Sequence, residues 1–71
     1  MTYQKFKDII EIWDNHFRQV VYIQKKSDAE FNVIDTIQVG NRWKVVGIKS
    51  YPMAKLDIMR ACLADYRYFK V

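Results

Sequence analysis

The segment from Gly40 to Leu63 constrains the fold of this chain more than any other. It opens with Gly40-Asn41, two residue types that tolerate the backbone angles of a tight turn. Arg42 to Ser50 follows, and its β-branched and aromatic residues predict a strand. Pro52 then comes where the first turn of a helix has no use for a backbone N–H, and Ser50 is placed to cap that helix. The segment therefore predicts a strand that leads directly into a helix.

Two apolar stripes have the spacing of an amphipathic helix. The first predicts a helix from Tyr3 to about Phe17, with a stripe of Phe6, Ile9, Ile10, Trp13 and Phe17. The second predicts a helix from about Met53 to Tyr68, with a stripe of Met53, Leu56, Met59, Leu63 and Tyr66.

Two further strands are predicted between these helices. Gln19 to Gln24 is β-branched and aromatic, and Glu30 to Val39 alternates apolar and polar residues, with a bulge or bend expected at Ile34-Asp35. The order α-β-β-β-α predicts one α+β domain over residues 1–71. In it, a three-stranded antiparallel sheet carries two helices on one face. The other face would stay open to water or to a partner.

Composition says more about the cellular location and the possible partners of the protein than about its function. Twelve Lys and Arg residues against eight Asp and Glu residues give a net charge of +4, which permits an anionic partner. Cys62 is the only cysteine, so no disulfide forms within one chain, and its place in the helical pattern predicts a core residue. We expect a cytoplasmic protein, or a nuclear one. No apolar run has the length of a membrane span, so no membrane partner is expected.

The sequence offers little for catalysis. His16 is the only histidine, and no Cys or Ser lies near it in the sequence to complete a nucleophilic pair. The acids lack metal-ligand spacing, and two glycines do not make a phosphate-binding loop. The chain is therefore predicted to be a non-catalytic binding module without a cofactor or a metal.

Basic residues around the expected second helix are the best candidate site. Unpaired N–H groups at a helix start favour an anion, and Lys49 and Lys55 flank that start. The predicted RNA-binding residues are Lys49, Ser50, Lys55, Lys44 and Arg42, with Arg60 further along the helix. The same charges also fit an ordinary solvated surface. Aromatic residues suggest a partner interface instead, comprising Tyr51, Trp43, Tyr66, Tyr68 and Phe69.

The chain resembles the double-stranded-RNA-binding domain in its expected order of elements and in spaced residues of its last forty positions. These residues are Phe31 and Val33, Gly40 and Trp43, then Ser50, Ala54 and Lys55 of the Ser-Lys-Lys-x-Ala-Lys signature. The resemblance implies binding of double-stranded RNA through the N-terminus of the second helix, with Lys55 and Lys49 on phosphates.

The chain departs from that family at two places. Tyr51 and Pro52 stand where the signature has two lysines, and the Gly-Pro-x-His loop between the first two strands is absent. Family members without the lysine pair often bind proteins. The alternative prediction is therefore a protein-interaction or dimerisation module, such as a small viral or regulatory factor that has lost RNA binding.

Overall fold

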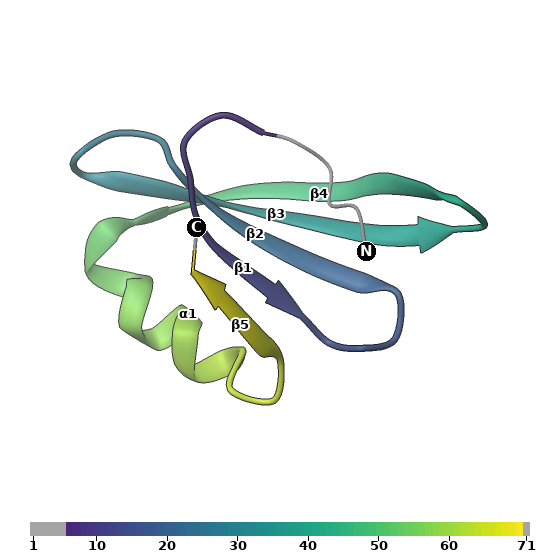
Figure 1. Cartoon of the computed structure of the whole chain (residues 1–71). Coiled ribbons are helices and arrows are strands. Elements are labelled where there is room, and N and C mark those ends of the chain that lie inside the picture. Colours follow the sequence, from purple (N-terminus) through teal and green to yellow (C-terminus); the bar gives the residue numbers. More distant parts are fainter. Residues whose placement is uncertain (1–5, 71) are drawn as a thin grey trace.

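The computed structural model describes residues 6–70 and shows one antiparallel sheet with a short helix against one face (Figure 1). The five strands lie in the order β4-β3-β2-β1-β5. Their bounds are β1 Ile9–Asp14, β2 Gln19–Lys25, β3 Glu30–Val39, β4 Arg42–Pro52 and β5 Arg67–Lys70. A 3-10 turn, η1 (Met53–Lys55), continues into the helix α1 (Leu56–Cys62).

Short turns connect the first four strands as successive hairpins. The register pairs Ile12 with Tyr22 and Tyr22 with Ile34, so the sheet is continuous from β1 to β3. After β4 the chain crosses the sheet as η1 and α1, and β5 then pairs with β1 at the opposite edge. The two edges are therefore the long strand β4 and the four-residue strand β5.

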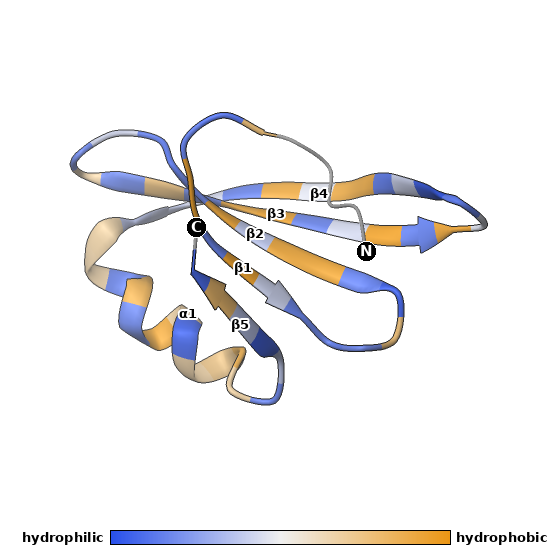
Figure 2. Ribbon diagram, in the orientation of Figure 1, coloured by the Kyte–Doolittle hydropathy of each residue, from blue (hydrophilic) through white to orange (hydrophobic). Residues whose placement is uncertain are grey.

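The face covered by α1, called the helix face below, holds the larger core. Phe31 and Ile23 are fully buried there, and Leu63 closes the core from the end of the helix. All members of the stripe predicted for the second helix pack on this core: Met53, Leu56, Met59, Leu63 and Tyr66. Only Leu56 and Met59 of them lie in α1, so the packing of the stripe is confirmed but its continuous helix is not. Figure 2 shows the apolar residues that recur along β2 and β3.

The opposite face is not open along its whole length, contrary to expectation. Val20 and Tyr22 are fully buried on it, together with Ile34. The Phe6 ring meets the Tyr22 ring edge-on, with 5.0 Å between centroids, so the segment before β1 covers part of this face. The sheet thus has a core on both sides.

The predicted α-β-β-β-α fold is wrong at both ends of the chain. Residues 9–14, expected in a helix, form β1, and positive φ angles at Asp8 (59°) and His16 (71°) leave no room for a continuous helix. The stripe had helical spacing, but Ile9, Ile10 and Trp13 suit a strand equally well. Residues 1–5 of the expected helix lie outside the described part.

The second predicted helix ends early, at Cys62, and its expected last residues form β5. Cys62 is exposed, so the prediction of a core cysteine is also wrong. The strand over Glu30–Val39 is confirmed, as is the Gly40-Asn41 turn, where Gly40 has φ of 61°. A bulge does lie beside Asp35, but β4 carries the extra residue.

Candidate nucleic-acid interface

Strand β4 brings three of the predicted cationic residues onto one side of the sheet. Arg42 pairs with Val39, Lys44 with Ile37 and Lys49 with Val33. These three partners alternate along β3 on the helix face, so the three cations share that face.

A bulge makes this arrangement possible. Lys44 and Lys49 are five positions apart, and an odd spacing places two side chains on opposite faces of a regular strand. The register shift pairs Val45 with Thr36 and Gly47 with Asp35, so Val46 is an extra residue. The extra residue returns Lys49 to the side of Lys44. The bulge therefore determines that the cations form one row, called the β4 row below: Arg42, Lys44 and Lys49.

The β4 row is exposed and unpaired. Within residues 6–70, no carboxylate lies within ion-pair distance of Arg42, Lys44 or Lys49. The Lys49 ammonium lies 5.5 Å from the centroid of the Tyr51 ring, a cation–π contact that leaves its charge available. These side chains can therefore bind an external anion without first breaking an ion pair.

Asp35 is the acid next to this row. It lies on the helix face, where it pairs with Val21 of β2 on one side and with Gly47 of β4 on the other. The next residues of β4 on this face are Lys44 in one direction and Lys49 in the other. Burial raises the pKa of the Asp35 carboxyl, because desolvation disfavours its charged form. Asp35 thus weakens the positive potential at the centre of the row.

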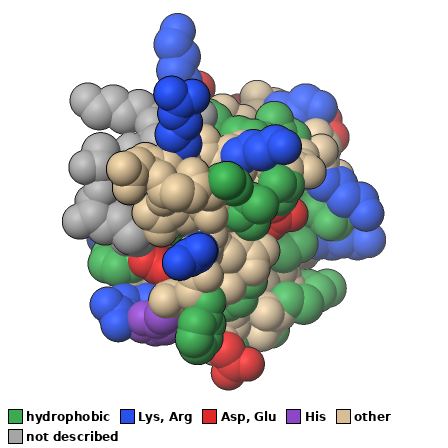
Figure 3. All heavy atoms as spheres, turned by 90° about the vertical axis from the view of Figure 1, so that its right-hand side faces the viewer, with side chains coloured by type: hydrophobic (Ala, Val, Ile, Leu, Met, Phe, Trp, Pro, Cys, Tyr) green, Lys and Arg blue, Asp and Glu red, His purple; other side chains and the backbone are tan. Residues whose placement is uncertain are grey.

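The turn between β1 and β2 lies beside the β3–β4 turn. The Gln38 amide donates a hydrogen bond of 2.7 Å to the Arg18 carbonyl, and this contact joins the two turns. Figure 3 looks onto this end of the sheet, where Lys and Arg side chains (blue) lie around hydrophobic ones (green), with some acidic side chains (red) and the histidine (purple) among them. Phe17 is 82% exposed and Val39 is 57% exposed here. The predicted core role of Phe17 is therefore wrong.

Side-chain hydrogen bonds hold the β1–β2 turn in one shape. The Asn15 carbonyl oxygen accepts from the backbone amides of Phe17 (2.9 Å) and Gln19 (3.2 Å). The Asp14 carboxylate accepts from the His16 amide at 2.8 Å. His16 and Arg18 both have positive φ, at 71° and 88°, which is costly for residues with a Cβ. These contacts stabilise a strained turn that displays Phe17.

The residues expected at the helix start are not arranged as a phosphate site. Ser50 does not cap the helix: it lies in β4 on the face opposite Lys49, and its hydroxyl donates to Asn32 Oδ1 at 2.7 Å. Neither η1 nor α1 has a side-chain cap, and α1 is only seven residues long. Lys55 is exposed at the junction of η1 and α1, beyond the end of β4.

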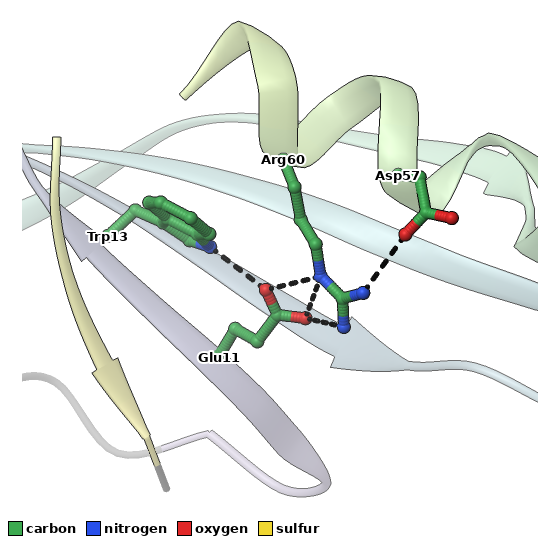
Figure 4. Close-up of polar contacts among 4 residues, drawn as sticks. All are labelled: Glu11, Trp13, Asp57 and Arg60. Carbon is green, nitrogen blue, oxygen red and sulfur yellow. Dashed lines mark hydrogen bonds and ion pairs between the residues drawn. The ribbon is translucent and has the colours of Figure 1, made fainter. Parts of the chain in front are cut away.

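Arg60 is not free, in contrast to the β4 row. Its guanidinium donates to both Glu11 carboxylate oxygens, with a shortest distance of 2.7 Å, and to Asp57 at 3.1 Å (Figure 4). The Glu11 side chain is only 3% exposed and also accepts from the Trp13 indole at 3.3 Å. Hydrogen bonding with Glu11 raises the pKa of Arg60. This cluster joins α1 to β1 and is structural.

The aromatic candidates are mostly part of the fold. Tyr51 stacks on Phe31 with 5.7 Å between centroids, and the Tyr66 hydroxyl donates to Gln19 at 3.1 Å. Trp43 packs on the buried cluster of the opposite face. Phe69 is half-buried in β5, whereas Tyr68, in contact with Trp13, is 48% exposed. Tyr68 is thus the most exposed of the five.

The described residues form neither a metal site nor a membrane-spanning helix. No group of three or more His, Cys, Asp or Glu side chains is placed to hold a metal ion in residues 6–70. Over the same range, no helix has the length and apolar character needed to cross a membrane. No family model, curated protein or solved structure matches this chain.

Proposed function

We propose that this protein is a non-catalytic RNA-binding module that binds the phosphate backbone along β4. The observation that carries the proposal is the β4 row, three exposed cations that form no ion pair within residues 6–70 and that the Val46 bulge brings onto one face. Arg18, at the adjoining turn, adds a fourth cation without an ion pair in the same described range. RNA remains the expected ligand, but its contact surface moves from the start of the helix to the edge strand.

Charge distribution supports this surface over the rest of the molecule. Two cations elsewhere are paired with carboxylates: Lys25 with Asp28 at 3.1 Å, and Arg60 with Glu11. The other exposed cations of residues 6–70 are spread over several elements and form no row: Lys7, Lys26, Lys55, Arg67 and Lys70. The turn between β3 and β4 carries no acid, since its residues are Val39, Gly40, Asn41 and Arg42. A phosphate chain laid along β4 therefore meets positive charge from the turn to Lys49, interrupted only by half-buried Asp35.

Titration of labelled RNA at increasing salt tests the proposal. Each phosphate contact contributes about 0.7 (single strand) to 0.9 (duplex) to the slope of log affinity against log salt. Contacts from Arg18 and the β4 row predict a slope of about −3 for a single strand. The triple variant Arg42→Gln, Lys44→Gln, Lys49→Gln should bind more weakly, with a slope reduced by about 2.

A matched variant separates a site from general charge. Lys7→Gln, Lys26→Gln, Lys70→Gln also removes three positive charges from exposed positions, but none belongs to the β4 row. It should retain most of the affinity and the slope. Equal losses in the two triple variants, or no RNA binding by the unmodified protein at low salt, would contradict the proposal.

A second candidate function is protein binding at the free edge of β4. This strand is eleven residues long and is an edge strand of the sheet formed by residues 6–70, and its Val46 and Ile48 side chains are 52% and 61% exposed. A partner strand can pair with such an edge. Sedimentation that shows a dimer, together with failure to bind RNA, would favour this function over the first.

A further inference from the structure

We infer that the β1–β2 turn uses Phe17 to stack on an unpaired nucleobase, so that the module prefers single-stranded nucleic acid over a duplex. This inference rests on the proposed function, because the β4 row must hold the same strand by its phosphates. It adds Phe17, an uncharged residue, to the binding surface, and it specifies single-stranded nucleic acid as the ligand.

The first argument is the exposure of Phe17. Burial of a Phe side chain stabilises a protein, and Phe17, at 82% exposed, contributes little of this stabilisation. The ring has no aromatic neighbour within the described residues. Most of the ring surface is therefore available for stacking.

The second argument is that the turn is rigid. Asn15 accepts from the amides on either side of Arg18 and also donates to the Gln19 side chain at 2.9 Å. Positive φ angles flank Phe17 at His16 and Arg18. A backbone held in this way loses little conformational entropy when the side chain that it carries contacts a ligand. Backbone strain of this kind persists only where surrounding contacts hold the residue in its strained conformation, and such residues are frequent at binding sites.

The third argument is the position of the ring relative to the cations. Arg18 follows Phe17 directly and is hydrogen-bonded to Gln38, which pairs with Trp43 between Arg42 and Lys44. Two strand spacings, about 10 Å, thus separate the backbone of the turn from that of β4. A nucleotide strand that leaves the β4 row at Arg42 comes directly to Phe17.

An aromatic ring beside a cationic row selects unpaired bases on physical grounds. Bases inside a duplex already stack on each other, so an outside ring reaches only bases that are splayed out. Aromatic stacking combined with a basic track along the backbone is the usual way in which single strands are held. An acidic protein partner would form ion pairs with the β4 row, but its carboxylates provide no flat surface on which the Phe17 ring could stack.

The test compares binding of a labelled single-stranded RNA with binding of a duplex at fixed salt. Phe17→Ala should weaken single-strand binding about tenfold, the contribution of one stacked base, and leave duplex binding nearly unchanged. Its salt slope should not change, because no phosphate contact is lost. The thermal midpoint serves as the folding control and should change little, since Phe17 is 82% exposed.

Two further substitutions separate stacking from simple apolar contact. Phe17→Trp keeps a flat ring and should retain the affinity, whereas Phe17→Leu keeps apolar surface without a ring and should behave like Phe17→Ala. Equal binding by Phe17→Leu and the unmodified protein would overturn the inference. So would an equal loss of single-strand and duplex binding in Phe17→Ala.

Two other ligands complete the design. Single-stranded DNA of the same sequence should show the same dependence on Phe17, and tighter binding of RNA would assign the site to RNA. Polyglutamate has charge but no bases, so weaker polyglutamate binding by Phe17→Ala would overturn stacking in favour of a protein partner. If unmodified protein binds no nucleic acid, the proposed function fails as well. If the unmodified protein binds RNA but the Phe17 variants do not change binding as predicted, the stacking inference fails and the proposed function stands.

Discussion

Arg60 and the β4 row show two uses of positive charge in one small sheet. The Arg60 guanidinium lies over the helix face within hydrogen-bond distance of both carboxylate oxygens of buried Glu11. These hydrogen bonds connect α1 to β1. Arg42, Lys44 and Lys49 are exposed along the edge strand, and no carboxylate of residues 6–70 forms an ion pair with them. The first region uses its charge for the fold, whereas the second leaves its charge available for a ligand. Substitutions should therefore affect stability in one region and binding in the other.

The largest effect on stability is expected at Arg60. Arg60→Ala leaves the buried Glu11 carboxylate without its cation and should lower the free energy of unfolding by about 2 to 3 kcal/mol. This value lies below the full cost of an unpaired buried charge, because Arg60 is itself half-exposed. The loss is large for a 71-residue chain, whose total stability is of order 4 to 10 kcal/mol. Urea denaturation followed by circular dichroism measures it.

Asp57→Ala is the matched control for that prediction. It removes the other ion pair of the same arginine, but the Asp57 side chain is 93% exposed. The expected cost is below about 1 kcal/mol. If the two substitutions cost the same, Glu11 does not depend on Arg60, and the contrast between buried and exposed charge is wrong.

A smaller effect is expected at Asn15, where the fold and the ligand surface meet. Asn15→Ala removes the hydrogen bonds to Phe17 and Gln19 and should cost about 1 to 2 kcal/mol. Because the turn loses its fixed shape, single-strand binding should also weaken, although no cation is removed. Denaturation and RNA titration of the same preparation check both results. A loss of stability with unchanged affinity would mean that rigidity of the turn does not matter for binding.

Asp35→Asn should have a modest effect of opposite sign. The folded state raises the pKa of Asp35 above 3.8, so it binds the proton more tightly than the unfolded chain does. Stability due to this group therefore falls as the pH rises from 3.8 through the folded pKa, and stays lower above it. The Asp35→Asn variant has no carboxyl group to ionise and does not lose stability in this way as the pH rises. It should therefore be more stable than the unmodified protein at neutral pH. Removing one negative charge near the row should also raise RNA affinity about twofold.

Parallel measurements at acidic and neutral pH check the sign for Asp35. The stability difference between Asp35→Asn and the unmodified protein should be smallest at the acidic end, where both carry a neutral side chain. Lower stability of Asp35→Asn than of the unmodified protein at neutral pH, with the difference vanishing toward acidic pH, would show instead that Asp35 is stabilised as an anion.

The smallest effect on stability is expected from the triple glutamine variant of the β4 row. Its three side chains are exposed, and none forms an ion pair with residues 6–70, so the free energy of unfolding should change by no more than about 0.5 kcal/mol. RNA affinity should nevertheless fall strongly. A loss of stability comparable to that of Arg60→Ala would remove the distinction between the two regions.

The sequence predicted the centre of the fold better than its ends. The strand Glu30–Val39, the Gly40-Asn41 turn and the apolar stripe from Met53 to Tyr66 follow from local patterns that the final packing respects. At the N-terminal end, Ile9, Ile10 and Trp13 satisfy helical and strand patterns together, and only pairing with distant β2 and β5 decides between them. Asp14-Asn15 is a turn signal that would have supported the strand.

The candidate site was predicted in part. Arg42, Lys44 and Lys49 were identified from charge, but their common face depends on the Val46 bulge, which was expected in the partner strand. Ser50 was assigned to a helix cap that does not form, since the strand continues to Pro52. Phe17 was missed because its spacing completed an apolar stripe, although it directly precedes the β-branched run of the next strand.

Amide chemical-shift mapping of the folded protein during RNA titration tests the central claim most directly. The account predicts that the largest shifts occur at Phe17 and Arg18 and along residues 42–49, and that α1 (Leu56–Cys62) is little affected. Shifts concentrated on α1, or no shifts at low salt, would contradict it.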